Sequence, residues 1–327
     1  MAAQQGESGE QVKFRPRRLT HANMRFSDAD KSLEFYNKVC GLELVWTKPG
    51  TNTSFVTNGN THHDMAVGQI PDLREPPPRG HRSAPRLNHI AFEMESEAEL
   101  VEGWRRAQQA GLKFRETDHG PTRSIYISDP EDNGIEIYAD VTKDWRHFVN
   151  MEHPDRIHSS PWTPGETPPC TEARYVGDPE IRRVEGAIFN PRRFAHAALA
   201  VEDFEAMSEF YTEIVGLEEV LRGPNDSYSV LSGTAQGHAL TLFKAGENQP
   251  LGLQHVAFEL DDERELDEAQ ERMREAGIEP TIQLDHATKR AIFLKDPDGM
   301  GVEFFIDKGG HVGTLAGLEP ALAVHLA

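Results

Sequence analysis

Cysteine, basic charge and long apolar runs are all scarce in this sequence. Its 327 residues include only two cysteines, Cys40 and Cys170, which excludes a disulfide framework and a CxxC metal knuckle and fits a reducing cytoplasm. No run of about 18 apolar residues is present, so no membrane-spanning helix is expected. The formal net charge of −20 argues against nucleic acid as a partner, because phosphate binding requires a basic surface.

What the sequence does contain is an internal repeat, the first thing to look for in any chain. Paired residues are 175 positions apart before the Pro-rich stretch 69–86, and 166 or 167 apart after it. The pairs are His21 with His196, Phe35-Tyr36 with Phe210-Tyr211, Gly41-Leu42 with Gly216-Leu217, His63 with His238, His89 with His255, His119 with His286, Tyr126 with Phe293, Asp129 with Asp296, and Glu136 with Glu303. The chain is therefore a duplicated domain.

Each half is expected to contain two units with the order strand, helix, strand, strand, strand. The fold class is therefore α+β. In the first half, strands are expected at 18–26, 42–47, 53–57, 62–68, 87–94, 113–117, 124–128 and 134–139, with helices before Gly41 and at 96–110. The same plan recurs in the second half, with helices at 203–215 and 262–276.

These elements predict two tandem domains, at residues 14–143 and 191–308. Residues 1–13 are expected to be a flexible N-terminal tail without an apolar signal core. Residues 144–190 are expected to be a linker or wrap, and residues 309–327 a C-terminal tail.

In each half, two histidines lie on the first strands of successive units and a glutamate lies on the last strand. In the first half these are His21, His89 and Glu136. Two imidazoles and one carboxylate form the facial triad that leaves positions open on Fe(II), whereas a structural zinc site is closed by four ligands. A single strand histidine is more often an ordinary core residue. The ordered recurrence as His196, His255 and Glu303 favours metal ligands.

A longer motif surrounds each glutamate. The first half has His119, five residues, Ile125-Tyr126, Asp129-Pro130 and Glu136, and the second has His286, Ile292-Phe293, Asp296-Pro297 and Glu303. In these motifs, and over roughly 14–140 and 190–310, the chain resembles the type I extradiol ring-cleavage dioxygenases of the vicinal oxygen chelate superfamily. Asp132 replaces the usual Gly or Pro, Phe293 replaces the tyrosine, and Leu284 is atypical.

The resemblance implies two tandem vicinal-oxygen-chelate domains, each a pair of βαβββ modules that forms a cupped mixed sheet. It implies extradiol cleavage of a small aromatic diol at Fe(II), with Mn(II) as a possible replacement and O2 as co-substrate. The product would be a 2-hydroxymuconic semialdehyde-type acid of aromatic catabolism. Relatives are commonly homo-oligomers, so a homo-oligomer is expected here, without a nucleic acid or membrane partner.

The resemblance also assigns roles to individual residues. His63, which precedes Asp64 as the family's active-site histidine often precedes an aspartate, is the expected acid–base group. His119 and Tyr126 are expected to donate hydrogen bonds to the substrate oxygens. His62 is expected to face the other side of its strand.

We favour the triad of the first half as the active one, because His63-Asp64 and Tyr126 are both present there. Better-known two-domain relatives keep iron in the C-terminal half. The second triad, with His238 and His286 in its pocket, is thus a further candidate metal site.

Other functions stay open at this point. A glyoxalase-like isomerase or epimerase would need another carboxylate within 64–68, where Asp64 is the only acid. A non-catalytic binding protein would need no triad, and a keto-acid dioxygenase could use the same one. Within the stretch 69–86, basic groups could meet a carboxylate on the substrate. They are Arg79, His81, Arg82 and Arg86.

Overall fold

The computed structural model describes residues 14–70, 86–247, 249–309, 312–315 and 317–326. The expected N-terminal tail at 1–13 and the interior of the Pro-rich stretch lie outside these residues, so the roles suggested for Arg79, His81 and Arg82 are not addressed by the structure. None of the helices in the described part of the chain combines the length and apolar character needed to cross a membrane.

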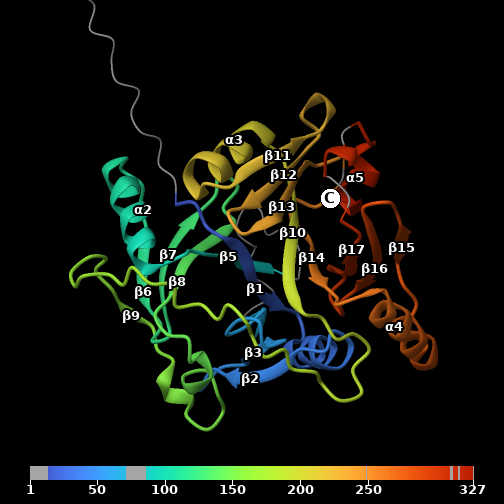
Figure 1. Ribbon diagram of the computed structural model, residues 1–327, viewed down its shortest axis with the longest axis horizontal. Coiled ribbons are helices and arrows are strands. Elements are labelled where there is room, and N and C mark those ends of the chain that lie inside the picture. Colours follow the sequence, from blue (N-terminus) through green and yellow to red (C-terminus); the bar gives the residue numbers. More distant parts are fainter. Residues whose placement is uncertain (1–13, 71–85, 248, 310–311, 316, 327) are drawn as a thin grey trace, which may run out of the picture.

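Two mixed β-sheets lie side by side, one from each half of the sequence (Figure 1). The first sheet has the strand order β2-β3-β4-β1-β5-β8-β7-β6-β9. Its strands are β1 (Arg18–Phe26), β2 (Glu43–Thr47), β3 (Thr53–Thr57), β4 (Met65–Gln69), β5 (Arg86–Glu93), β6 (Arg115–Asp118), β7 (Thr122–Ser128), β8 (Gly134–Asp140) and β9 (Ser160–Pro161).

The second sheet repeats this arrangement with the order β11-β12-β13-β10-β14-β17-β16-β15. Its strands are β10 (Arg193–Val201), β11 (Glu218–Arg222), β12 (Tyr228–Gly233), β13 (Gln236–Lys244), β14 (Gly252–Glu259), β15 (Ile282–Asp285), β16 (Lys289–Lys295) and β17 (Gly301–Asp307). In each sheet the first strands of the two modules pair antiparallel, and each pairs in parallel with the last strand of its own module. The α+β fold with paired βαβββ modules is confirmed.

The helix of each module begins directly after an aspartate or serine that caps its N-terminus. The helices are α1 (Ala29–Glu34), α2 (Glu97–Gln109), α3 (Phe204–Glu209), α4 (Glu263–Ala276) and α5 (Pro320–Leu326). The side chains of Asp28, Ser96, Asp203 and Asp262 accept backbone N–H bonds at the first four helix starts. α1 and α3 continue as π-helical turns, and the chain then passes through Gly41 and Gly216 with φ of 75° and 81°, a conformation that glycine adopts without strain.

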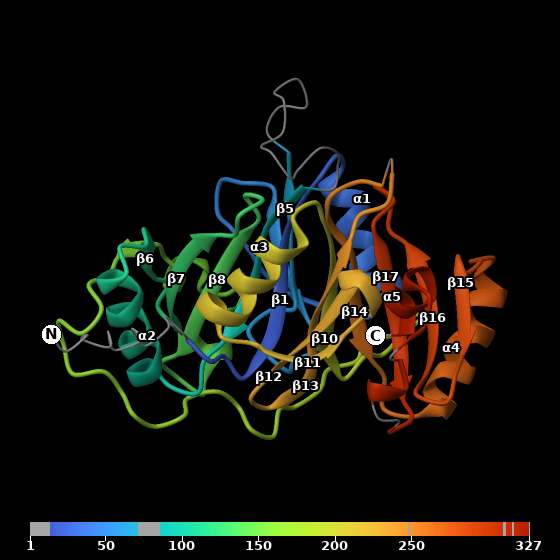
Figure 2. The same ribbon diagram turned by 90° about the horizontal axis from the view of Figure 1, so that it is seen from above.

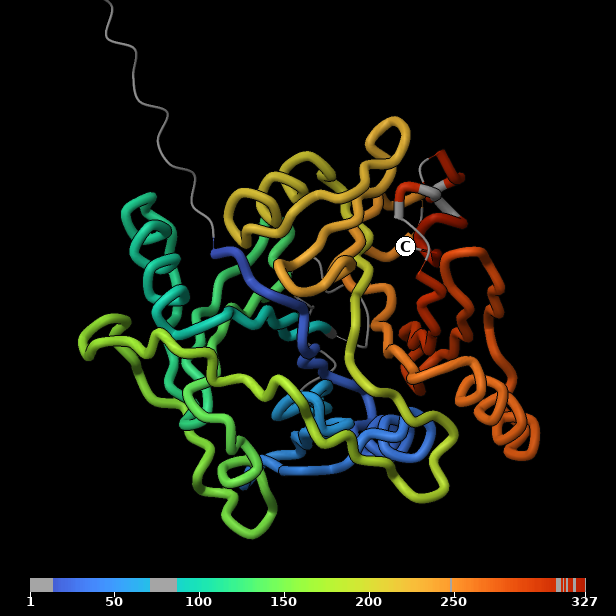
Figure 3. The backbone as a smooth tube through the Cα atoms, viewed as in Figure 1, coloured from blue at the N-terminus to red at the C-terminus, as the bar shows by residue number. Residues whose placement is uncertain are grey.

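Helices α2 and α4 lie at opposite ends of the molecule (Figure 2). The segment between β8 and β10 crosses from the first half to the second over one side (Figure 3). Its backbone bonds to the first half at Ala98, Asn58 and Val39, so it is tied down along its length.

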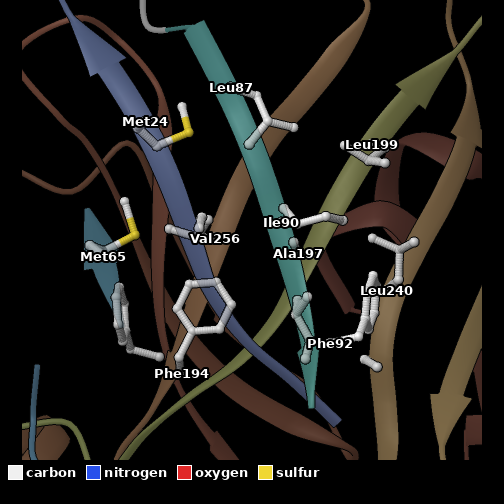
Figure 4. Packing of buried hydrophobic residues seen from close by; sticks show 14 of the residues in the cluster. Met24, Met65, Leu87, Ile90, Phe92, Phe194, Ala197, Leu199, Leu240 and Val256 are labelled. Carbon is white, nitrogen blue, oxygen red and sulfur yellow. The ribbon is translucent and has the colours of Figure 1, made fainter. Parts of the chain in front are cut away.

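The two sheets share one hydrophobic core, which Figure 4 shows at its centre. Met24 and Ile90 project from β1 and β5 on one side, and Ala197 and Val256 project from β10 and β14 on the other. Ala22, the neighbour of His21, belongs to the same cluster of buried residues. Because neighbouring side chains on a strand alternate between faces, His21 projects away from this core. The two sets of histidines therefore project away from the shared interior, on separate sides of the protein.

Reciprocal hydrogen bonds join the two halves at the repeated Phe-Tyr and Asp-Pro motifs. The buried Tyr36 hydroxyl donates to Asp296 Oδ2 at 3.1 Å, and the buried Tyr211 hydroxyl donates to Asp129 Oδ2 at 3.0 Å. Each aspartate also accepts two backbone N–H bonds within its own turn. Residues that recur at a fixed spacing thus hold the duplicated units together.

Tyr211→Phe is expected to lower the free energy of unfolding by about 1.5–3 kcal/mol, the range for a hydrogen bond to a charged group. Tyr36→Phe should cost a similar amount, because its contact is the symmetric counterpart. Denaturant titration measures both. Tyr175→Phe is the control, since that hydroxyl bonds to the more exposed Glu95. Equal stabilities for all three variants would show that the reciprocal bonds do not hold the halves together.

Candidate metal centre

The strand register brings the first triad together. His21 on β1 lies opposite Ala91 on β5, and Ala91 lies opposite Glu136 on β8. His89 is two residues from Ala91 and therefore shares its face. Register shifts interrupt the β1–β5 pairing just before His21 and just after Asn23. Such irregularities redirect side chains beside functional sites. Three neighbouring strands thus supply one ligand each.

The ligand atoms of the first triad meet at one carboxylate oxygen. His21 Nε2 lies 3.1 Å and His89 Nε2 lies 3.0 Å from Glu136 Oε2. One ligand atom from each residue lies within 4.8 Å of the other two, and all three residues are buried. Nitrogen and oxygen donors gathered this closely suit a divalent metal.

Burial sets the charge of these groups. It lowers the pKa of His21 below its usual range, despite the nearby Glu136. For Glu136, burial acts to raise the pKa, but the hydrogen bonds to His21 and His89 hold it well below its usual range. Metal ligands must be neutral imidazoles and ionised carboxylates. The pKa shifts of His21 and Glu136 favour that state at neutral pH.

His63 and His62 both lie beside the triad. The His63 ring centroid is 4.0 Å from that of His21, and the His62 centroid is 5.5 Å from it. The expectation that His62 faces away is wrong. The strand begins only at Met65, and the preceding residues form a turn in which Asp64 accepts the backbone N–H of Asn58, so strand alternation does not apply.

The His63 Nε2 atom is buried and has no hydrogen-bond partner among the described residues. Burial lowers the pKa of His63 well below its usual range, with further lowering by His21 and His62. A buried polar atom without a partner costs free energy. Because His63 lines the cavity, a ligand bound there could form the missing hydrogen bond with this nitrogen. The three histidines also form a close group, but that group offers a metal no anionic donor.

His119 and Tyr126 form a hydrogen-bonded chain that ends on the triad. The Tyr126 hydroxyl lies 2.9 Å from Glu136 Oε1 and 2.9 Å from His119 Nε2. On the far side, His119 Nδ1 lies 3.0 Å from the carbonyl oxygen of His158 and is its donor. Nε2 of the neutral ring is then an acceptor, so the Tyr126 hydroxyl has one proton for two acceptors.

A cavity of about 680 Å³ opens onto the triad. Its wall includes His63, His89, Tyr126 and Glu136, and apolar surface from Trp46 and Phe55. This size is typical of a site for a small organic ligand. The predicted site residues His21, His63, His89, His119, Tyr126 and Glu136 are therefore brought together, and most of them face open space.

The second triad is closed by a lysine. His196 Nε2 lies 3.0 Å and His255 Nε2 lies 3.5 Å from Glu303 Oε2. Lys289 Nζ lies 2.8 Å from the other oxygen of Glu303, and both side chains are buried. Burial, followed by the Lys289 charge, holds the pKa of His196 well below its usual range. The corresponding residue of the first half is Thr122.

An ammonium group already neutralises Glu303, and a divalent ion bound there would be repelled by it. The second set of residues therefore does not fit a metal, although its histidines and glutamate match the first set. Sequence reasoning missed Lys289. The signal was available, because reading the repeat at its 167-residue offset pairs Lys289 with an uncharged threonine.

The surroundings of the second triad also differ. His238 stacks on His196 at 3.9 Å, but its Nε2 is bound to the Thr241 hydroxyl at 2.8 Å. His286 bonds to Thr288, and among the described residues it makes no hydrogen bond to the triad. Phe293 has no hydroxyl, and His325 of α5 packs 5.1 Å from its ring. The proton-sharing chain of the first half is thus missing here.

Comparisons with known proteins agree with this architecture. A model of the Glyoxalase/Bleomycin resistance protein/Dioxygenase superfamily matches residues 18–137 and 193–304. The catechol-2,3-dioxygenase of Bacillus subtilis (strain 168) is 25% identical over 308 residues, which cover 88% of this chain and 97% of that protein. The biphenyl-2,3-diol 1,2-dioxygenase 3 of Rhodococcus globerulus is 30% identical over 122 residues, which cover 35% of this chain and 63% of that protein.

Solved structures share the fold. The 2,3-dioxygenase LapB from Pseudomonas sp. KL28 has a TM-score of 0.65 at 18% identity and covers 90% of this chain and 93% of its own. The Mn(II)-bound glyoxalase from Novosphingobium aromaticivorans has a TM-score of 0.63 at 17% identity, with 91% and 86% covered. At these identities the likeness establishes the tandem fold and not the reaction.

Lys289→Met is expected to lower the free energy of unfolding by about 3–5 kcal/mol in the presence of EDTA, because it leaves Glu303 buried and uncompensated. The neighbouring Arg290→Gln is the control. It breaks an ion pair to the exposed Asp267 and should cost at most about 1 kcal/mol. Urea titration measures both variants. A Lys289→Met variant as stable as the wild-type protein would contradict the assigned ion pair.

Proposed function

Because the chain belongs to the Glyoxalase/Bleomycin resistance protein/Dioxygenase superfamily, we propose that its first half opens the ring of a catechol-type diol with O2. Cleavage is extradiol, outside the two hydroxyls. His21, His89 and Glu136 would hold Fe(II), or Mn(II) in its place. The observation that carries the proposal is a three-ligand site that opens onto a cavity lined by His63 and Tyr126.

The first half is favoured over the second for two physical reasons. Its buried Glu136 has two imidazoles and a hydroxyl as partners, and none of them is a permanent cation such as lysine. A divalent cation provides a permanent positive charge. In the second half, Lys289 supplies it already, and Phe293 replaces the tyrosine.

When bound, the metal would chelate the diol, lower the pKa of its hydroxyls and bring it together with O2. His63 then accepts a hydroxyl proton from the substrate. Its Nε2 is buried without a partner among the described residues, and its lowered pKa keeps the ring neutral and able to act as a base. General acid–base catalysis of this kind contributes about 10²–10⁴ in rate.

The Tyr126 hydroxyl, bonded to His119 and Glu136, keeps a second proton beside the triad. Burial raises the pKa of Tyr126 well above its usual range, with Glu136 adding to the effect, so the hydroxyl keeps its proton and acts as a hydrogen-bond donor. His119 is the alternative acceptor of that proton. The Tyr126 hydroxyl, positioned by His119, can therefore donate a hydrogen bond to a substrate oxygen on which negative charge develops.

A glyoxalase-like isomerase is the main competing function, and one observation speaks against it. Such an enzyme would place a fourth, carboxylate ligand within residues 64–68. The Asp64 side chain is engaged in its own turn, and position 68 is a glycine whose side-chain space is occupied by the Arg25 guanidinium. The three-ligand site therefore stays open.

An aerobic panel of catechols tests the proposal. The Fe(II)-loaded protein is expected to turn at least one of them into a yellow ring-opened product and to consume one O2 for each ring. The Zn(II)-loaded protein should form none, because zinc has no redox chemistry. Turnover of methylglyoxal with glutathione, and no turnover of any catechol, would reject the proposal in favour of the isomerase.

In the same assay, His63→Ala is expected to lower kcat by about 10²–10⁴. His238→Ala is the matched control, because it removes the corresponding histidine of the second half and should leave kcat unchanged. Metal content of both variants shows whether the effect is on chemistry or on metal binding. Wild-type turnover by His63→Ala would mean that another group takes the proton.

A further inference from the structure

We propose that the cavity of the first half selects a diol whose ring carries a carboxylate or a similar anionic substituent, and that Arg25 binds this substituent. This inference rests on the proposed ring-cleavage function and adds the class of substrate. No motif or comparison assigns a role to Arg25.

Arg25 lines the same cavity as the triad. It lies on β1 two residues beyond Asn23, and its guanidinium donates a hydrogen bond of 3.0 Å to Asn23 Oδ1. Within the described ranges of the chain, no carboxylate lies within ion-pair distance of it. Burial lowers the pKa of Arg25, which reflects the free-energy cost of removing a cation from water. A partly buried cation beside a substrate cavity is suited to an anionic ligand.

The fold makes room for this guanidinium. Arg25 pairs in register with Gly68 on the parallel strand β4. A Cβ atom at position 68 would lie 2.3 Å from one terminal nitrogen of Arg25 and 3.0 Å from its Cζ. Any side chain there would displace the guanidinium, so the glycine keeps the arginine on the cavity wall.

The repeat provides an internal comparison. At the same register in the second sheet, Ala200 pairs with Phe243. Both are buried in an apolar cluster with Ala323 and Val324 of α5. The second half thus fills these two paired positions with a small and a large apolar side chain. The first half instead has an arginine paired with a glycine, which has no side chain. The arginine is therefore found in the half whose triad faces the cavity of about 680 Å³.

The other charged residues of the cavity wall also favour an anionic ligand. Lys48 and Arg115 also line it, and the acids there are the metal ligand Glu136 and the exposed Asp155. Arg115 stacks over the Tyr126 ring at 3.9 Å. The chain as a whole carries −20, so basic groups gathered at one cavity oppose the global charge and attract anions locally.

The spacing also suits a substituted ring. Asn23 lies opposite the metal ligand His89, and two residues of strand, about 7 Å, separate Asn23 from Arg25. That length matches the span of a benzene ring and one substituent. A diol held at the triad can therefore present a ring carboxylate to Arg25.

Two matched substrate pairs test the inference. They are 3,4-dihydroxybenzoate against 4-methylcatechol, and 2,3-dihydroxybenzoate against 3-methylcatechol. The wild-type Fe(II) protein is expected to have a higher kcat/KM for the acid in at least one pair. In that pair, Arg25→Gln should lower the acid-to-methyl ratio of kcat/KM by about 10- to 100-fold, the loss of one charge-assisted hydrogen bond.

Two further variants separate charge recognition from a folding defect. Gly68→Ala keeps every charge but crowds the guanidinium, and it should lower the same ratio. Lys113→Gln removes an exposed cation of the first half that does not line the cavity and should leave the ratio unchanged. A wild-type preference for the methyl catechols in both pairs, or an unchanged ratio in Arg25→Gln, would overturn the assignment.

If the wild-type protein opens none of these four diols, Arg25 is tested by binding alone, and the proposed reaction fails only if no catechol of the wider panel is opened. Anaerobic calorimetric titration of the Mn(II)-loaded protein with each pair then measures binding alone. Tighter binding of an acid that is lost in Arg25→Gln supports the anion site. Equal binding of acid and methyl compound by both proteins rejects it.

Discussion

A buried glutamate that needs a positive charge is the constraint on which each half of this protein depends. Glu136 and Glu303 occupy the same place in the two sheets, each beside two buried histidines. A carboxylate removed from water is strongly destabilising unless it is compensated. Lys289 compensates Glu303. Among the described residues, the partners of Glu136 are two imidazoles and a hydroxyl, and in the proposed function a divalent metal would supply the positive charge. One scaffold thus satisfies the same requirement in two ways.

The duplication separates structural from chemical residues. Tyr36 and Tyr211 bond reciprocally to the aspartates of the opposite half, so both copies of these motifs contribute to the contact between the halves. The positions around the cavities are free to diverge, because they project away from the shared core. Where the first half has a threonine, a tyrosine and an arginine, the second has Lys289, Phe293 and Ala200. The first half keeps a cavity beside its triad, whereas the second half fills the position that corresponds to Arg25 with apolar side chains.

Much of this arrangement follows from the sequence. The fixed offsets and strand alternation predict both triads and the paired modules, because register and face are local properties. His62 was assigned to the wrong face because the turn that ends at Asp64 was read as strand. Lys289 and Arg25 were overlooked because each is an ordinary basic residue until its partner at the same register is known. The packing of α5 against the second sheet depends on tertiary contacts that no local pattern encodes.

The iron content of two matched variants shows which half of the protein binds the metal. Wild-type protein, His21→Ala and His196→Ala are reconstituted with Fe(II) without oxygen, freed of excess metal and analysed for iron, with circular dichroism as a check of folding. We expect one iron per chain in the wild-type protein, close to none in His21→Ala, and one in His196→Ala. Iron that is retained by His21→Ala and lost from His196→Ala would place the metal in the second half and contradict the account.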